Sequence, residues 1–224
     1  MTRPAAIVTT GPACAPIDEV RCIANFATGE TGAVIAGALI AEGWDVFLFR
    51  GRGSTISEVP AGAHLHEFTT NQELARGLEE LSETRGKDIA AVMHAAALSD
   101  YAVASVRGPD GASLGVGKIS SDLAHLHLVL EPAVKLLPRM RGWFARAWIV
   151  GWKYELEGMR EEAIAAAREQ VARGRTDASV VNGSAYGPGF GVLEGEKSPQ
   201  HFATKRELAQ FLASRATTAA KSDK

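Results

Sequence analysis

The stretch TGETGAVIAGALIAEGWDVFLF, Thr28–Phe49, contains a helix pattern, its end and a strand pattern in one continuous run. Thr28 can cap a helix that extends to about Glu42. Gly43 suits the left-handed turn that ends many helices, and the apolar run Asp45–Phe49 then predicts a strand. One face of the predicted helix is apolar and carries Val34, Ile35, Ala38 and Leu39. The stretch therefore predicts a helix that feeds directly into a buried strand.

The same alternation extends in both directions from this stretch. Further strands are predicted at Ala5–Thr10, His64–Phe68, Ile89–Ala95, Ala147–Trp152 and Ala178–Asn182. Further helices are predicted from a cap at Asn71, at Pro132–Arg141, from Glu161 to Gly174 and at Lys205–Ser214. Strands that alternate with amphipathic helices predict an α/β fold, with a Rossmann-like, mostly parallel sheet flanked by helices.

Three other segments complete the predicted organisation. Leu126, Leu128 and Leu130 alternate as in a half-buried strand, and a glycine-rich stretch runs from Ser105 to Gly117. Phe190–Glu194 and His201–Ala203 predict a small β-hairpin near the C-terminus. We expect residues 1–216 to form a single domain and residues 217–224 to form a flexible tail.

The composition narrows the function classes. The chain has 224 residues, 46% hydrophobic and 22% charged, with 24 Lys and Arg against 26 Asp and Glu. A net charge of −2 argues against bulk electrostatic binding to nucleic acid or to an anionic membrane, so small molecules are the expected partners. No export signal or membrane-spanning run is evident, which predicts a soluble cytoplasmic protein with Cys14 and Cys22 as free thiols.

Standard phosphate motifs are absent. Around Lys118, Ala112 and Ile119 stand where a P-loop needs Gly and Ser or Thr, and neither Gly51-x-Gly53 nor Gly187-x-Gly189 continues to the third glycine of the dinucleotide motif. A general NAD-dependent interpretation therefore loses its main support. Because parallel sheets bind ligands beyond the carboxyl ends of their strands, the residues that follow each predicted strand are the candidates for a site.

Six short motifs occur in the order found in one enzyme family. APIDEVRCIANFATGETG at Ala15–Gly32 resembles the signature of phosphopantothenate–cysteine ligase, the phosphopantothenoylcysteine synthetase. The resemblance continues through ALSDY at Ala97–Tyr101, KISS at Lys118–Ser121, VGWKYEL at Val150–Leu156, SVVN at Ser179–Asn182 and the closing KRELAQFL at Lys205–Leu212. It covers about residues 5–212 and resembles the stand-alone form without the flavin decarboxylase half, so no flavin is expected.

The resemblance implies an activity. Members of the family activate the carboxylate of 4′-phosphopantothenate with CTP or ATP, release pyrophosphate, and pass the acyl-nucleotidylate to the amine of cysteine. Mg²⁺ is the implied cofactor, with the nucleotide as co-substrate. A homodimer with a shared site is the implied assembly.

The resemblance also implies residue roles. Asn25 and Lys118 take the catalytic positions: an uncharged Asn25 donor suits a carbonyl oxygen that becomes an oxyanion, and Lys118 belongs to a mobile loop over the triphosphate. The substrate contacts implied are Arg21, Asn25 and Ala97, and the nucleotide contacts are Gly11, Asp100, Lys118, Lys153 and Asn182. Without the resemblance, each would be a turn residue, a strand-end polar residue or an ordinary surface charge.

The sequence also departs from the family pattern. Pro12 stands in the glycine-rich turn after the first strand, Ala27 replaces a hydroxyl residue, and Glu30 reverses a common positive charge. A divergent nucleotide-binding paralogue, acting on a related acid or serving as a scaffold, therefore stays open as an alternative. The two histidine pairs, His64 with His66 and His125 with His127, lack a third ligand and are expected to be ordinary strand histidines.

Overall fold

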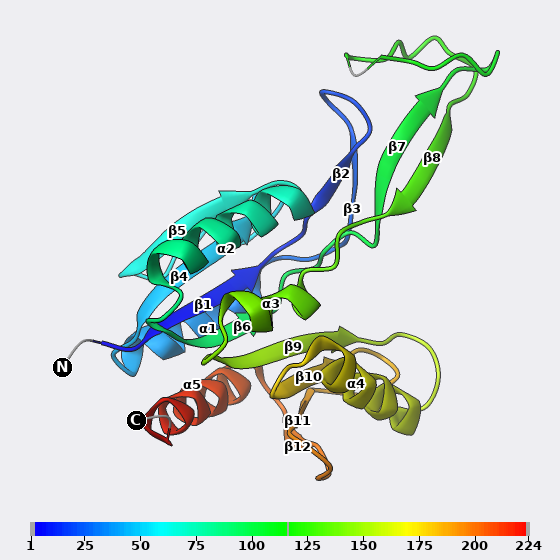
Figure 1. The fold of residues 1–224 in the computed structure, drawn as a ribbon. Helices are drawn as coiled ribbons and strands as arrows, with labels where there is room; N and C mark the ends of the chain where they lie inside the picture. Colours follow the sequence, from blue (N-terminus) through cyan, green and yellow to red (C-terminus); the bar gives the residue numbers. More distant parts are fainter. Residues whose placement is uncertain (1–2, 116, 223–224) are drawn as a thin grey trace.

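The computed structural model describes residues 3–115 and 117–222, and its centre is one large β-sheet (Figure 1). Eight strands lie in the order β12–β11–β10–β9–β6–β1–β4–β5. In chain order they are β1 (Ala5–Thr10), β4 (Asp45–Gly51), β5 (Ala63–Phe68), β6 (Ile89–His94), β9 (Trp148–Tyr154), β10 (Ala178–Asn182), β11 (Phe190–Leu193) and β12 (Gln200–Phe202). The strands from β10 to β5 are parallel, and β11 and β12 form an antiparallel hairpin beside β10. The predicted fold class and C-terminal hairpin are confirmed.

Helices cover both faces of the sheet, and each face has its own core. On one face, α1 (Glu30–Ala41) and α5 (Lys205–Ser222) pack against alternate residues of the strands, including Val8, Leu48 and Val150. On the other face lie α2 (Asn71–Arg85), α3 (Leu137–Trp143) and α4 (Arg160–Gly174). Because parallel strands are buried on both faces, β1 is apolar at most positions rather than alternating.

Two of the predicted helix caps are different in the structure. Gly29, with a positive φ of 84°, is the N-cap of α1 in place of Thr28. The N-cap of α2 is Thr70, whose hydroxyl accepts from the backbone N–H of Glu73. Asn71 lies inside that helix, and its amide bonds the backbone of Ser99 in both directions. Asn71 therefore fixes the segment that follows β6 rather than the start of a helix.

The predicted flexible tail from residue 217 is wrong for the part that the structure describes. α5 continues to Ser222 because Ala216 is fully buried and Ala219 and Ala220 pack on the same core. Trp44 also donates its indole N–H to the Thr217 hydroxyl. Residues 223–224 lie outside the described residues.

Two small antiparallel hairpins lie outside the main sheet and project from its carboxyl edge (Figure 1). The first pairs β2 (Cys14–Pro16) with β3 (Cys22–Ala24), and the second pairs β7 (Tyr101–Arg107) with β8 (His127–Pro132). The strand expected at 126–130 is present as β8, but the expected half-burial is wrong, since every residue of β8 is exposed. The partly buried residues of this ribbon belong to β7, which contacts β2 of the first hairpin, so the alternation of leucines in β8 does not mark a face turned to the core.

Candidate active site

The turn after β1 is held against the segment that follows β6. Gly11 has a positive φ of 75°, and its carbonyl oxygen accepts from the backbone N–H of Ala97 at 2.9 Å. In return, the N–H of Ala13 donates to the carbonyl of Ala97 at 2.9 Å. The structure therefore brings two of the predicted site residues, Gly11 and Ala97, into direct backbone contact.

Asn25 joins the same group from the first hairpin. It follows β3 directly, and its Nδ2 donates to the carbonyl oxygen of Leu98 at 2.8 Å. Its side chain is exposed, so the amide is accessible to a ligand. Asn25 therefore lies beside Leu98, the residue that follows Ala97.

Arg21 and Lys118 are brought together through the residue that follows the lysine. Arg21 donates from Nη2 to the carbonyl oxygen of Ile119 at 2.7 Å, and it also pairs with Asp18. The Arg21 guanidinium and three backbone N–H donors hold the pKa of the Asp18 carboxyl well below its usual range. Much of the Arg21 guanidinium is thus engaged within the protein, which the sequence did not predict.

The glycine-rich stretch before Lys118 is more ordered than its composition suggests. Gly111 donates to Gly108, and Gly108 donates to the carbonyl of Ala112, which closes a tight turn beyond β7. Leu114 then donates to Val106 at 2.8 Å. Gly108 and Gly111 are therefore held by backbone hydrogen bonds within this turn. Lys118 itself is exposed.

The remaining predicted residues lie at the same edge without bonds to the Asn25 group among the described residues. Asp100 forms an exposed ion pair with Lys135. Lys153, near the end of β9, pairs with Glu155 at 2.8 Å. Asn182, at the end of β10, accepts from the indole N–H of Trp152 at 3.1 Å. β9 lies next to β6 and β10 lies next to β9, so these groups extend the edge sideways from the Ala97 segment.

One part of the site was not found from the sequence. The hydroxyl of Ser54, after β4, is buried and has no hydrogen-bond partner among the described residues. It lies between Gly11 and Gly29, where an added Cβ would come within 2.0 Å and 2.8 Å of that oxygen. An unpartnered hydroxyl beside the N-terminus of a twelve-residue helix is suited to an anionic group. No sequence pattern marks this position, because it depends on the approach of Gly11 and Gly29 to Ser54 in the folded chain.

Glu30, the reversed charge, has a partner. It lies in the first turn of α1 and forms an ion pair with Lys205 at the start of α5. The pair offsets the negative charge that Glu30 adds beside the helix N-terminus. This departure from the family pattern is therefore compensated locally.

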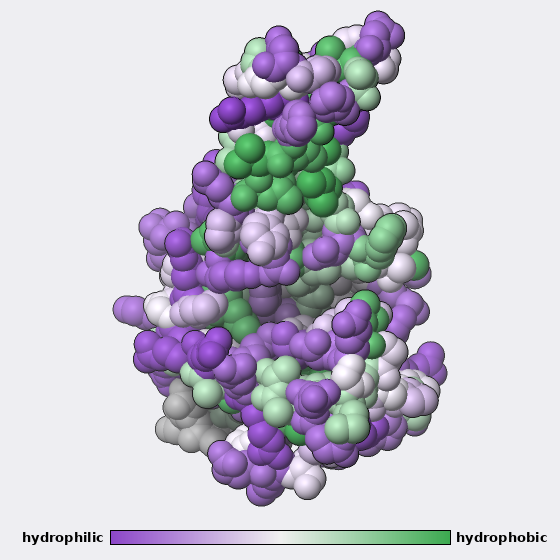
Figure 2. Space-filling model, turned by 90° about the vertical axis from the view of Figure 1, so that its right-hand side faces the viewer, coloured by the Kyte–Doolittle hydropathy of each residue, from purple (hydrophilic) through white to green (hydrophobic). Residues whose placement is uncertain are grey.

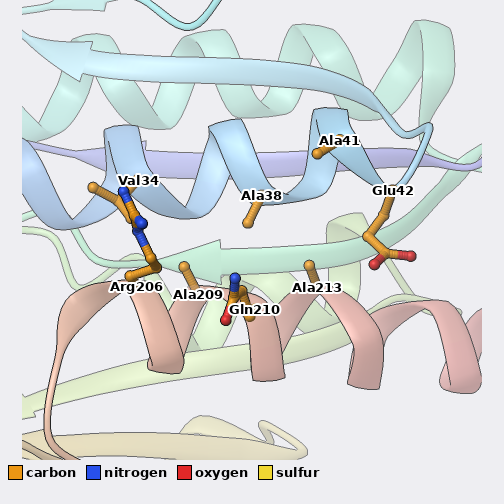
Figure 3. A pocket seen from close by; sticks show the side chains of 8 residues that line it. All are labelled: Val34, Ala38, Ala41, Glu42, Arg206, Ala209, Gln210 and Ala213. Carbon is orange, nitrogen blue, oxygen red and sulfur yellow. The ribbon is translucent and has the colours of Figure 1, made fainter.

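Two surface hollows lie away from this group of residues. One groove of about 350 Å³ lies between α1 and α5 and is lined largely by alanines (Figure 3). A second, of about 950 Å³, lies at the amino ends of β1, β6 and β9, and includes Arg3, Lys87 and Lys221. None of the predicted site residues lines either groove. The chemistry-bearing side chains instead form an open edge, which is compatible with a site completed by bound substrates or by a second subunit.

Other protein side chains contact the remaining reactive residues His64, His66, Cys14 and Cys22. His64 and His66 stack on Phe47 and Phe49, with ring centroids 5.0 and 4.8 Å apart. Cys14 is a free thiol, as is Cys22, and burial with a hydrogen bond between the two raises the pKa of Cys14 to about 12. Within residues 3–115 and 117–222, no three or more His, Cys, Asp or Glu side chains form a metal-binding cluster.

An apolar surface lies beneath the tip of the projecting hairpins (Figure 2). Exposed large apolar side chains belong to both hairpins and the residues beside them: Val20, Ile23, Phe26, Tyr101, Leu128, Val129 and Leu130. An exposed apolar patch such as the one in Figure 2 is typical of an interaction surface. In the described part of the chain, no helix has the length and apolar character needed to cross a membrane.

The comparisons with known proteins agree on one family. Residues 1–218 match the family described as the DNA/pantothenate metabolism flavoprotein C-terminal domain. The coenzyme A biosynthesis bifunctional protein CoaBC of Thermococcus kodakarensis is 34% identical over 216 residues, covering 92% of this chain and 49% of the relative. The corresponding protein of Methanocaldococcus jannaschii is 29% identical over 166 residues, covering 74% of this chain and 37% of the relative. The chain spans about half the length of the curated relatives or less.

Solved structures share the fold over almost the whole chain. The DNA/pantothenate metabolism flavoprotein from Streptococcus pneumoniae superposes with a TM-score of 0.82 at 23% identity, covering 96% of this chain and 99% of that one. A Cab2 H337A mutant in complex with phosphopantothenate-cysteine superposes with a TM-score of 0.77 at 17% identity, covering 98% and 87%. At these identities the superpositions establish the fold.

Proposed function

Because the chain belongs to the DNA/pantothenate metabolism flavoprotein C-terminal domain family, we propose that it is a phosphopantothenate–cysteine ligase. The observation that carries the proposal is the convergence of Gly11 and Asn25 on the segment that follows β6: Gly11 bonds the backbone of Ala97, and the Asn25 amide bonds the backbone of Leu98. The relatives named as coenzyme A biosynthesis proteins support the same assignment.

The proposed reaction has two steps. A carboxylate oxygen of 4′-phosphopantothenate attacks the α-phosphorus of CTP or ATP, and pyrophosphate leaves. The cysteine amine then attacks the acyl carbon, the nucleoside monophosphate leaves, and the amine loses a proton. In this scheme Asn25 donates to the acyl oxygen while it gains negative charge, and Lys118 offsets the negative charge of the carboxylate and triphosphate. The charged Lys118 thus serves the activation of the carboxylate, and the neutral Asn25 serves the formation of the amide.

We place the nucleotide along the edge from β4 to β10. The Ser54 hydroxyl and the N-terminus of α1 supply donors for phosphate, and Asp100, Lys153 and Asn182 would contact the nucleotide from the ends of neighbouring strands. Ion pairs with Lys135 and Glu155 would have to open or be shared when it binds. Mg²⁺ would arrive with the triphosphate, since it is usually held by phosphate oxygens, water and one or two carboxylates. Asp100 is the carboxylate best placed in sequence and fold for that contact.

Arg21 can still contact the substrate phosphate. Its Nε and Nη2 bond Asp18 and Ile119, while Nη1 has no hydrogen-bond partner among residues 3–115 and 117–222. The side chain is 39% exposed. A guanidinium fixed on one side and open on the other suits a phosphate oxygen.

We also propose a homodimer in which the exposed apolar surface of the two hairpins is the contact. This surface adjoins Asn25 through Phe26 and Ile23, so a partner that covers it would also enclose the site. Burial of such apolar side chains favours association by about 25 cal/mol per Å² of surface removed from water. In such a dimer, the hairpins of the partner would form a further wall of the site.

The experiment is an assay of pyrophosphate release with 4′-phosphopantothenate, cysteine, Mg²⁺ and either CTP or ATP. Release that depends on the acid, with phosphopantothenoylcysteine detected by mass spectrometry, is the expected result. A double variant, Asn25→Ala with Lys118→Ala, is the negative control. If neither nucleotide supports acid-dependent release, the assignment is wrong.

The second candidate is a nucleotide-binding paralogue that acts on a related acid or serves as a scaffold. Pro12, Ala27 and Glu30 favour it, although Lys205 neutralises Glu30. Titration calorimetry that detects CTP or ATP binding in a protein without turnover would support this candidate over the ligase.

A further inference from the structure

Asp18 lies in the tight turn of the first hairpin, and its side chain is fully enclosed. Oδ1 accepts from the backbone N–H groups of Val20 and Arg21, at 2.9 and 2.8 Å. Oδ2 accepts from Arg21 Nε at 3.0 Å and from the backbone N–H of Ile119 at 3.1 Å. One oxygen therefore shapes the turn of the hairpin, while the other reaches a residue 101 positions further along the chain.

Ile119 is bound at both of its backbone polar groups. Asp18 accepts from its N–H, and Arg21 donates from Nη2 to its carbonyl oxygen at 2.7 Å. The Ile119 side chain is also buried, with 7% of the residue exposed. A residue held through its N–H, its carbonyl and its side chain is a firm anchor in an otherwise exposed segment.

The residue directly before this anchor is Lys118. On its other side, the segment is fixed at Leu114, whose N–H donates to Val106 in β7. Lys118 therefore lies in a short span between two fixed points, with exposed Gly115 and Gly117 inside that span. Glycine accepts many backbone conformations, so the position of Lys118 depends on the anchors rather than on the span itself.

We propose that Asp18 is a positioning residue for Lys118: by holding Ile119 against the first hairpin, it keeps the lysine beside the hairpin that carries Asn25. The inference rests on the proposed function, because it takes Lys118 as a residue of the first reaction step. Asp18 itself has no role in contacting substrate. Its two oxygens accept five hydrogen bonds from protein donors, including both Nε and Nη2 of Arg21, which leaves it little capacity for a ligand.

The chemistry of the contact requires a carboxylate. An Asp18→Asn variant keeps the shape, but its NH₂ group opposes donors at one of the two oxygen positions. When the amide nitrogen takes the Oδ2 position, the N–H of Ile119 loses its acceptor. The variant should therefore release the anchor while the hairpin turn is retained.

Hydrogen exchange tests the anchor without reference to activity. In peptides that cover residues 117–121, we expect exchange at Ile119 to be about tenfold faster in Asp18→Asn, as the loss of one hydrogen bond to a charged group implies. Asp110→Asn is the matched control, since Asp110 accepts only from Ala112 within the preceding turn. Equal exchange in Asp18→Asn and the wild type would overturn the proposal.

A double-mutant cycle tests the connection to Lys118. In acid-dependent pyrophosphate release, Asp18→Asn should lower kcat about tenfold or more with little change in KM, and should have no further effect in a Lys118→Ala background. An equal loss of kcat in both backgrounds would show a general structural effect and overturn the proposal. If Asp18→Asn does not fold, Arg21→Lys removes the donor to the Ile119 carbonyl; it is judged by exchange at Ile119 and by kcat at saturating acid in both backgrounds, because a change in KM would report the contact of Arg21 with the substrate.

The two proposals can fail separately. A wild-type protein without acid-dependent pyrophosphate release contradicts the proposed function, whereas the anchor is still decided by exchange at Ile119. A wild-type protein that is active, with an Asp18→Asn variant that is equally active, contradicts the positioning role alone.

Discussion

The Nδ2 atom of Asn25 donates to the backbone oxygen of Leu98 at 2.8 Å and so joins residues 73 positions apart in the chain. This bond uses one of the two N–H groups of the amide. The other N–H and Oδ1 have no hydrogen-bond partner among residues 3–115 and 117–222. Asn25 is therefore fixed in place and still has a donor available for an acyl oxygen.

The first prediction concerns that donor. Asn25→Ala should accumulate the acyl-nucleotidylate, because pyrophosphate release does not need the amide, while amide formation slows by about 10²- to 10³-fold, as for loss of an oxyanion donor. Quenched single turnovers analysed by mass spectrometry measure both steps. Asn182→Ala is a control for the loss of an amide elsewhere on the edge. Equal loss of both steps in Asn25→Ala would contradict the division of roles.

The second prediction concerns Lys118. Lys118→Ala should block formation of the acyl-nucleotidylate, with pyrophosphate release reduced by about 10²-fold or more, since a cation that offsets the charge of two anions is lost. Lys118→Arg keeps the charge and should retain part of the rate. Accumulation of the intermediate in Lys118→Ala would instead assign the lysine to the second step.

The third prediction uses two glycines with similar backbone angles. Gly11 and Gly43 have φ values of 75° and 86°, but a Cβ at Gly11 would lie 2.0 Å from the Ser54 hydroxyl, whereas a Cβ at Gly43 has open space. Both alanine variants should lose about 1 kcal/mol from the unfavourable φ. Gly11→Ala should lose more stability in a denaturant titration and should also lose nucleotide affinity.

A second substitution separates the clash from the backbone strain. Ser54→Gly in the Gly11→Ala background should recover the additional loss of stability, since it removes the atom that the new Cβ meets. If Gly11→Ala and Gly43→Ala are equally stable, the close approach of Gly11 to Ser54 is not a constraint on the turn.

The fourth prediction is a dependence of stability on pH. Burial lowers the pKa of His94 to about 4, below its ordinary value of 6.5, so the neutral ring is the folded form. The unfolded chain takes up a proton between these values, and the folded chain does not. Stability should therefore fall as pH drops from about 6.5 to about 4, by about 3 kcal/mol at most, and level off below.

Urea titrations across this range measure the effect. His94→Gln should flatten the slope, while His125→Gln, at an exposed position, should leave it unchanged. A smaller slope should persist in His94→Gln, because partial burial also lowers the pKa of His66. An unchanged slope in His94→Gln would exclude His94 as its source.

The fifth prediction concerns assembly. Val129→Asp places a charge on the apolar surface of the hairpins and should convert a dimer into a monomer in light scattering, with loss of ligase activity. Leu65→Asp is the control, because Leu65 has similar exposure, 38% against 41%, but lies on the distant edge strand β5. A wild-type monomer with full activity would contradict the shared site.

Local patterns predicted the main sheet and failed at the hairpins, for a physical reason. β1, β4 and β10 are buried and apolar, and their strand pattern is visible in any short window. β2 and β3 have three residues each, too few for a periodicity to be detected. The alternation of leucines predicted a strand at β8, but nothing in the sequence predicted its pairing with β7 across a glycine-rich turn. Tertiary pairing alone defines them.

For the same reason, only part of the candidate site was predicted from the sequence. The family motifs identified Asn25, Ala97 and Gly11, which the structure brings together. The acceptor role of Asp18 depends on Ile119, and the position of Ser54 depends on two glycines from other segments. Contacts between residues so far apart in sequence leave no local pattern, and only the folded chain defines them.

The groove at the amino ends of the strands is lined by both Arg3 and Lys221, which lie near the two ends of the chain. The projecting hairpins and the carboxyl edge lie away from both ends (Figure 1). An affinity tag or a tether to a sensor surface, at either end, would therefore leave the carboxyl edge open to solution. A short peptide bridge between the ends would also suit a circular permutant with new ends at Gly195, an exposed turn with a positive φ.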